Sequence, residues 1–253
     1  MTHSEESEPA NFNTTHWSVV VSARDDSQNH STLRRESLES LCGTYWMPLF
    51  VYLRRKGISP DDSADYVQGF LAELVEKDFV KAVDREKGRF RWFLMSAINR
   101  FIAKQIEKKQ TLKRGGAVKT FSIDLPIDLE SAEQRYQNEP IDGWTPEKIF
   151  DRRWALTVLK QTLGQLETDY IELDQVDLFQ SLQPILLADS SKTKYKDIAH
   201  KLGMSEVAVK VAATRIRQRY KKKLSEIVCQ TLADADSLDD ELAILLAALR
   251  GEN

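Results

Sequence analysis

The chain has 253 residues, of which 42% are hydrophobic and 30% charged, and its formal net charge is −3 at pH 7. This length is enough for two modest domains, and the small net charge by itself indicates no nucleic-acid partner. No apolar run approaches the roughly 18 residues that cross a bilayer, and the two cysteines, Cys42 and Cys229, lie far apart. Because no signal peptide is evident, we expect a reduced, cytoplasmic protein with no membrane partner.

The charges are distributed unevenly along the chain. Residues 85–114 hold ten basic residues against two acidic ones, and residues 192–223 hold eleven against two. Residues 124–189, between these blocks, hold fourteen acidic residues against five basic ones. One basic block is most often a solvated helix face, but two of them on predicted helices with apolar partners favour nucleic-acid binding.

Helical signals begin near the N-terminus. Residues 1–13 are polar and are expected to be disordered, whereas a short helix is expected over residues 15–26. A long helix is predicted from residue 32 to Gly57, a residue type that commonly ends helices, with a kink at Pro48.

The next two helices have clearer boundaries. Ser59 can cap a helix in which Pro60 suits the first turn and acidic residues follow, next to the positive end of the helix dipole. A further helix is predicted over residues 90–109, where apolar residues recur at helical spacing. Together these helices predict one compact domain over residues 14–110.

Residues 111–144 have few periodic apolar positions. The segment begins near "KRGG" and contains Pro126 and Pro140, so we expect a flexible linker with limited structure. A second domain is predicted over residues 145–229. Its first helix has Thr145 as a cap and runs to about residue 166, and a helix over residues 176–187 must bend or end at its proline.

A helix-turn-helix is predicted at the end of the second domain. A short helix over residues 195–202 is followed by Gly203, which permits a left-handed turn. Met204 and Val209 can form a hydrophobic staple around a Ser205 cap at the start of the next helix. Some helix pairs of this kind never touch DNA, and the pattern alone leaves that alternative open.

The outer face of this last helix distinguishes the two alternatives. Val207 and Val211 project away from the predicted core and are surrounded by cations. Valine side chains have little use on a helix face that contacts only water. In a major groove, valines can contact thymine methyls, glutamine and threonine can bond base edges, and cations can neutralise phosphates. The predicted DNA contacts are Ser205, Val207, Lys210, Val211, Thr214, Arg215, Gln218 and Arg219.

The helix over residues 90–109 is a second candidate for nucleic-acid binding. Aromatic residues there, among them Trp92 and Phe93, alternate with Arg and Lys, a pattern that suits unstacked bases. The alternative is that the aromatic side chains belong to the domain core.

Beyond the second domain, residues 230–253 form an extension with one helix, predicted over residues 237–250. Ser237 and Asp240 resemble a capping box, and Gly251 follows the helix. The leucine stripe of this helix could pack back on a domain or bind a regulator, and the sequence leaves both alternatives open.

Three stretches in this order resemble bacterial RNA polymerase sigma factors of the extracytoplasmic-function (ECF) group. They are "ADYVQGF" (64–70), "RFRWFLMSAINRFIAK" (89–104) and "YKDIAHKLGMSEVAVKVAATRIRQRYKKKL" (195–224), within a resemblance that covers about residues 12–229. The resemblance implies an all-α fold in which two small helical domains, sigma regions two and four, are joined by a flexible linker. It implies a role in transcription initiation with core RNA polymerase (β′ clamp helices and β flap) and promoter DNA as partners. An anti-sigma factor is a further candidate partner.

The resemblance also implies roles for particular residues. Asp65 and Gln68 would contact the polymerase core, and the helix-turn-helix would read the minus-thirty-five element. Ala103 stands where many relatives have an acid, so the residue that captures a flipped base is left unassigned. The residues implied in minus-ten recognition are Arg89, Arg91, Trp92, Asn99, Arg100 and Lys104.

Three other functions compete with this interpretation. A stand-alone helix-turn-helix transcriptional regulator would use the same DNA-reading helix, and a helical adaptor would leave the outer valines unexplained. An enzyme is not expected, because Asp61, Asp62 and Asp65 lie near a helix N-terminus, where the dipole accounts for them. The four histidines are scattered and no phosphate-binding loop is present, so we expect no metal site and no cofactor.

Overall fold

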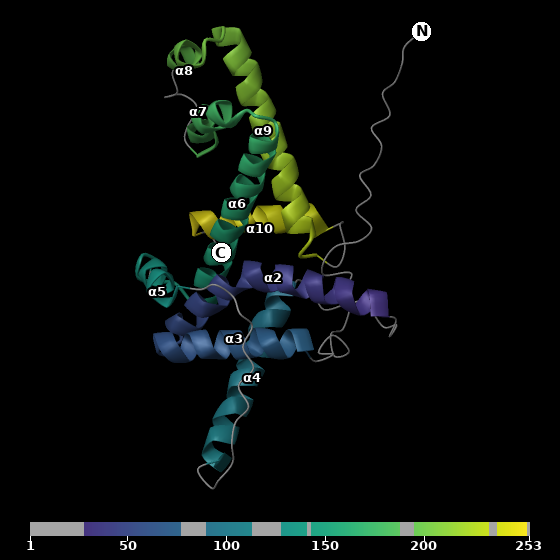
Figure 1. The fold of residues 1–253 in the computed structure, drawn as a ribbon. Coiled ribbons are helices and arrows are strands. Elements are labelled where there is room, and N and C mark those ends of the chain that lie inside the picture. Colours follow the sequence, from purple (N-terminus) through teal and green to yellow (C-terminus); the bar gives the residue numbers. More distant parts are fainter. Residues whose placement is uncertain are drawn as a thin grey trace. The chain divides into compact units, whose positions relative to one another are not determined.

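The computed structural model describes residues 28–76, 90–112, 128–140, 143–187, 195–232 and 237–251. All regular secondary structure in these ranges is helical, which confirms the all-α prediction for the described part of the chain (Figure 1). The expected disordered N-terminus and the expected helix over residues 15–26 lie outside the described residues.

The chain forms two compact units, and their limits differ from the expected domain limits. Unit 1 takes the described residues up to Ala155 and those from Cys229 onward, and unit 2 takes residues 156–228. The first division therefore falls inside a helix, α6 (Pro146–Glu172), and the C-terminal extension belongs to unit 1.

Helices α2 (Gln28–Arg55) and α3 (Pro60–Glu76) are joined by the turn that the sequence predicts. Helix α2 continues through Pro48 and ends before Gly57, whose φ of 85° is left-handed. The Ser59 hydroxyl accepts from the backbone N–H of Asp62 at 3.2 Å and donates to the Asp62 carboxylate at 2.8 Å, which confirms the predicted cap of α3.

An aromatic cluster forms the core of unit 1 where α2, α4 (Phe90–Leu112) and the start of α6 meet. The Tyr45 and Phe90 rings meet edge to face with centroids 5.1 Å apart, and the Phe150 ring is stacked 6.3 Å from Tyr45. Trp154 is fully buried in the same unit. Phe90 is thus a core residue, as the alternative interpretation of this basic stretch supposed.

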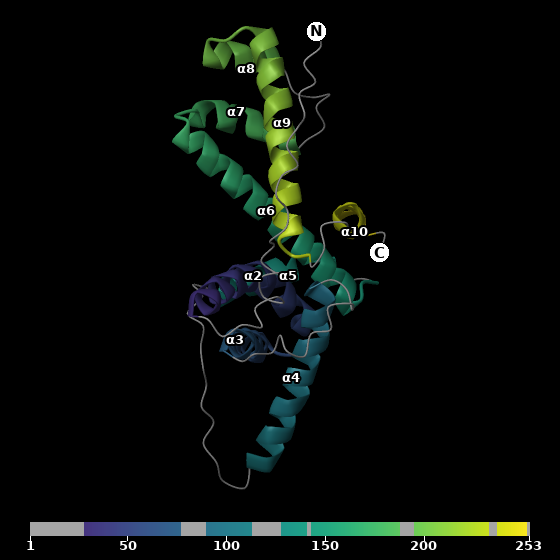
Figure 2. The same cartoon turned by 90° about the vertical axis from the view of Figure 1, so that its right-hand side faces the viewer.

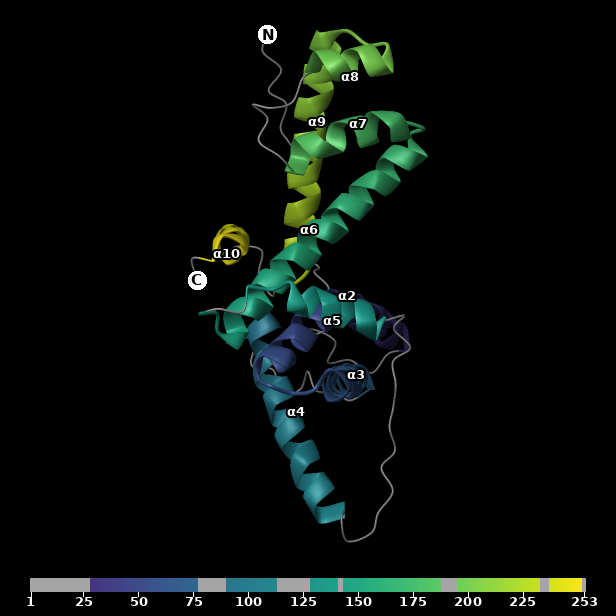
Figure 3. The same cartoon turned by 90° about the vertical axis from the view of Figure 1, so that its left-hand side faces the viewer.

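A helix, α5 (Leu129–Gln137), lies within the segment expected to be a flexible linker, so that expectation is corrected for these residues. The Asp128 side chain accepts from the backbone N–H of Glu130 at 3.1 Å and caps α5. Arg54 of α2 donates to both carboxylate oxygens of Glu133 at 2.8 and 2.9 Å, and α5 lies against α2 (Figure 3). Only Ala132 is buried along α5, so the helix lacks the apolar stripe by which the sequence could have revealed it.

The predicted ends of helix α6 and of the C-terminal helix α10 (Leu238–Arg250) agree with the structure only in part. The Thr145 hydroxyl accepts from the Lys148 N–H at 3.3 Å, which confirms that cap, although α6 continues six residues beyond the expected end. The Ser237 side chain makes no capping hydrogen bond at the start of α10, so this half of the predicted capping box is wrong. Gly251 ends α10 with a left-handed φ of 77°.

Unit 2 is built from the second part of α6 with α7 (Val176–Leu187), α8 (Tyr195–Leu202) and α9 (Glu206–Cys229). Helix α7 contains Pro184 without ending there. The buried cluster draws on all four helices and consists of Leu166, Tyr170, Phe179, Leu182, Ile185, Ala199, Val209, Ala213 and Ile216. None of the helices in the described ranges is long and apolar enough to cross a membrane.

The two faces of α9 should respond differently to truncation. Ile216→Ala removes a fully buried side chain and should lower the free energy of unfolding by about 2–5 kcal/mol, because a cavity remains in unit 2. Val207→Ala should change it by no more than about 0.5 kcal/mol, because that side chain is exposed. Urea denaturation followed by circular dichroism measures both changes. Equal effects of the two variants would contradict this division of α9.

Candidate nucleic-acid interface

The turn between α8 and α9 has the geometry that the sequence predicts. Gly203 has a left-handed φ of 63°, and the Met204 N–H donates to the Ala199 carbonyl at 2.9 Å. The Ser205 hydroxyl accepts from the Ala208 N–H at 3.2 Å and so caps α9. Helix α8 consequently lies beside the N-terminal end of α9 (Figure 2).

Helix α9 has one buried face and one exposed face that is partly apolar. Val209, Ala213 and Ile216 are buried in unit 2. Val207 and Val211 are 71% and 45% exposed, respectively. The other predicted contacts of this helix-turn-helix are exposed as well: Ser205, Lys210, Thr214, Arg215, Gln218 and Arg219. The structure thus places all eight predicted residues on the surface of unit 2.

Two of the three cations of α9 that are predicted to contact DNA already have partners on the protein. Lys210 Nζ lies 2.7 Å from the Glu206 carboxylate, one turn earlier, and 5.9 Å from the centre of the Tyr195 ring. The Arg219 guanidinium lies 5.3 Å from the centre of the Tyr170 ring. The Thr214 hydroxyl donates to the Lys210 carbonyl at 3.1 Å, which leaves its oxygen able to accept.

The Glu206–Lys210 pair shifts the pKa of both groups. Hydrogen bonding to Lys210, and then its charge, lowers the pKa of Glu206 below the ordinary range, and the same contacts raise the pKa of Lys210. Glu206 is not among the residues that the sequence predicts to contact DNA. Its position four residues before Lys210 on a helix is the signal that could have found the pair.

The residues predicted for minus-ten recognition divide into four groups, one of which is the buried Arg91. Trp92 is 57% exposed, and Arg100 and Lys104 are exposed on the same helix. Asn99 is partly exposed, and its amide donates to the Tyr52 hydroxyl at 2.9 Å and accepts from Lys56 Nζ at 2.7 Å. Arg89 lies outside the described residues.

Arg91 requires a correction, because the structure buries it. Its side chain is 1% exposed, and Nη1 lies 2.8 Å from Glu241 Oε1 of α10. Nε lies 3.4 Å from Asp151 Oδ1 of α6, and the guanidinium stands 4.9 Å from the centre of the Trp154 ring. A side chain held in this way presents no surface to DNA. The partners of Arg91 lie 60 and 150 residues further along the chain, so no local pattern indicates them.

Asp65 and Gln68 lie on α3 three residues apart. Asp65 is exposed and Gln68 is partly exposed, so both side chains are open to a partner. They lie in unit 1, as do the exposed residues of α4.

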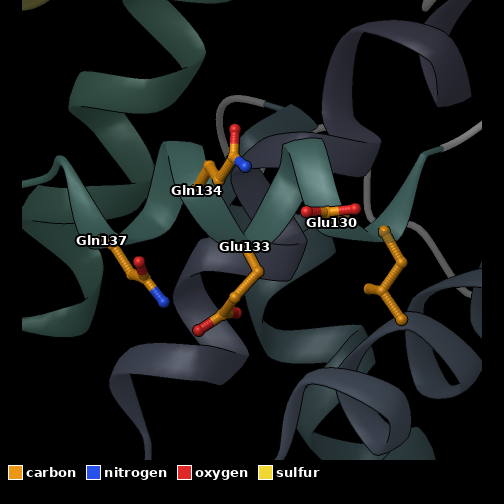
Figure 4. A pocket seen from close by; sticks show the side chains of 5 residues that line it. Glu130, Glu133, Gln134 and Gln137 are labelled. Carbon is orange, nitrogen blue, oxygen red and sulfur yellow. The ribbon is translucent and has the colours of Figure 1, made fainter.

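A pocket of about 480 Å³ lies beside α5 (Figure 4). It is lined by Leu129, Glu130, Glu133, Gln134 and Gln137. The Glu133 carboxylate is held by Arg54, so the pocket offers a ligand little beyond surface carboxylate and amide groups. The described residues contain no group of three or more His, Cys, Asp or Glu side chains that could hold a metal ion.

Comparison with known proteins finds no matching family model, no matching curated protein and no matching solved structure.

The Glu206–Lys210 pair gives a pH prediction. Because the folded-state pKa of Glu206 is lowered, the pair is complete above the ordinary pKa of glutamate and is lost as the pH falls through the lowered value. A carbon-detected NMR titration of the Glu206 carboxyl should therefore give a midpoint below the ordinary range. Lys210→Met should raise this midpoint, and Lys221→Met should leave it unchanged. An identical midpoint in the Lys210→Met variant would rule the pair out as the cause.

Proposed function

We propose that the protein is a sigma factor of the ECF type, which binds core RNA polymerase and directs promoter recognition in transcription initiation. The observation that carries the proposal is the surface of α9, where two exposed valines lie among cations on the outer face of a helix-turn-helix. Exposed valines in that setting are costly in water and useful in a groove, where they can meet thymine methyls.

In the proposed complex, α9 is the recognition helix for the minus-thirty-five element. Residues at the N-terminal end of such a helix contact base edges, and this is where Ser205, Val207 and Val211 lie. Gln218 and Thr214 can add hydrogen bonds, and Arg215 is exposed for a phosphate or a guanine. The Glu206 carboxylate competes with phosphate for Lys210, so we assign Lys210 a weaker role than the sequence suggested.

Helix α4 is proposed to bind the opened minus-ten element. An exposed tryptophan beside exposed cations suits unstacked bases, because the ring stacks on a base while cations hold the backbone. Trp92, Arg100 and Lys104 are all exposed on α4, and the two cations follow Trp92 by about two and three helical turns. Arg91 is removed from the set because it is buried, and Asn99 is kept only as a partly exposed residue with two partners of its own.

Helix α3 is proposed to dock on the β′ clamp helices of the polymerase, through Asp65 and Gln68. Both side chains are accessible. Unit 2 would dock on the β flap, as the resemblance to region four implies. With the polymerase holding both units, neither one needs high affinity for DNA alone, and this agrees with the modest net charge of −3.

A stand-alone helix-turn-helix regulator remains the second candidate, because the same face of α9 supports it. That candidate has no use for the exposed Trp92 and its neighbouring cations on α4. It predicts tight binding to a symmetric operator without polymerase, whereas a sigma factor should bind DNA weakly by itself.

Arg215→Ala tests the role of α9. In runoff transcription with core polymerase from the gene's own upstream region, it should reduce initiation because one cation leaves the DNA-facing surface. The salt dependence of holoenzyme binding to that promoter, plotted as log K against log salt concentration, should become shallower by about 0.9. Lys160→Ala removes an exposed cation from α6 in the same unit and serves as the control. Equal activity of both variants would remove Arg215 from the interface.

The double substitution Asp65→Ala with Gln68→Ala tests the role of α3. It should weaken association with core polymerase in a pull-down while the helical circular dichroism stays unchanged, because both side chains are at least partly exposed. Glu130→Ala with Gln134→Ala removes an exposed acid and amide from α5 and is the matched control. Normal holoenzyme formation by the Asp65/Gln68 variant would overturn the docking assignment.

A further inference from the structure

The C-terminal helix α10 is fastened to unit 1 by a buried charge pair at its N-terminal end. Glu241 lies in the first turn of α10, and both it and Arg91 are 1% exposed, with 2.8 Å between the charged atoms. Arg91 is the second residue of α4, so the pair joins the first turn of one helix to the first turn of the other. A buried ion pair of this kind depends on both partners, because either charge alone would be left without compensation.

A second contact fastens the other end of α10. Leu245 and Ala248 are buried along the helix, and Gly251 packs against the Trp144 indole so closely that a Cβ built there would lie 2.7 Å from Cζ2. Trp144 is itself held, because its carbonyl accepts from Arg55 Nε at 2.9 Å. Helix α10 is therefore attached through an ion pair at one end and a steric fit at the other.

The docked helix determines where the Arg91 guanidinium points. With Glu241 in place, Arg91 turns inward over Trp154, although its neighbour Trp92 is exposed. Without Glu241, the guanidinium would keep the Trp154 ring but, of its two acidic partners among the described residues, only the more distant Asp151, at 3.4 Å. Arginine stays ionised in proteins, so its charge would then favour water over the aromatic core.

We propose that α10 is an intramolecular latch that controls nucleic-acid binding by α4. When α10 is docked, Glu241 in its first turn pairs with Arg91 and takes the position that a phosphate would have. When α10 is released, the Arg91 side chain becomes exposed on the surface together with Trp92. The proposal rests on the proposed function of α4, but the docking of α10 can be measured independently of that function.

The test compares the full-length protein with Glu241→Ala and, as a control, with Asp239→Ala, which removes an exposed acid from the same turn. Hydrogen exchange reports whether α10 is docked, and fluorescence anisotropy reports binding of an oligothymidine of about 16 nucleotides. Glu241→Ala should remove the protection of α10 amides and tighten binding by roughly tenfold or more, as one added charge-assisted contact would. The salt slope should steepen by about 0.7, the value for one phosphate on a single strand. Asp239→Ala should leave the protection unchanged.

Two further variants test whether α10 controls nucleic-acid binding or only stabilises the fold. Arg91→Ala combined with Glu241→Ala should release α10 without the gain in affinity, because the added contact is Arg91 itself. Gly251→Val should undock α10 from its other end, because the added side chain clashes with Trp144. This variant should also tighten binding, although it leaves the Arg91 and Glu241 side chains themselves unchanged. This second route keeps the test decisive if Glu241→Ala fails to fold.

The outcomes distinguish the two proposals. Release of α10 without tighter binding, or a gain that persists without Arg91, would overturn the latch. Retained protection in both Glu241→Ala and Gly251→Val would overturn it as well. If no variant binds the oligonucleotide, with or without core polymerase, the proposed function of α4 fails, and hydrogen exchange still decides whether these contacts hold α10.

Discussion

A buried cation, the guanidinium of Arg91, connects several helices of unit 1. Arg91 lies among aromatic side chains, and it is tolerated there because Glu241 and Asp151 supply negative charge from α10 and α6. The effect of this setting extends to Tyr45, whose pKa is raised first by burial and then by the charge of Glu241, while Arg91 acts in the opposite direction. Charge compensation by Glu241 is thus one of the contacts that hold α10 in unit 1.

The same principle explains why α5 is ordered within an acidic segment. Glu133 of α5 pairs with Arg54 of α2. The buried Glu139, just beyond α5, pairs with Arg152 and Arg153 in the first part of α6. Burial lowers the pKa of Arg153, and the charge of Glu139 opposes that shift. Helix α5 lies in a segment whose composition predicts a flexible linker, and it is held there by partners of the opposite charge.

Unit 2 is subject to a different constraint, because one face of α9 packs in the core and the opposite face is exposed. Burial of Val209, Ala213 and Ile216 fixes the rotation of α9 about its axis, and this rotation places Val207 and Val211 outward. The candidate DNA-reading surface is therefore a consequence of core packing. Its apolar content distinguishes it from an ordinary solvated face. Some of its cations have protein partners, whereas for others, such as Arg215, the described part of the chain supplies none.

Local signals in the sequence determined what local physics can specify: the helical class, the caps at Ser59, Thr145 and Ser205, the left-handed turn at Gly203, and the two faces of α9. These features depend on residues within a few positions of one another, so spacing and residue type reveal them. Only the tertiary structure decided that Arg91 is buried, that α5 is a docked helix and that α10 packs on unit 1. Each of these depends on charges or rings that lie tens of residues apart in the chain, and such pairs leave no periodic trace in the sequence.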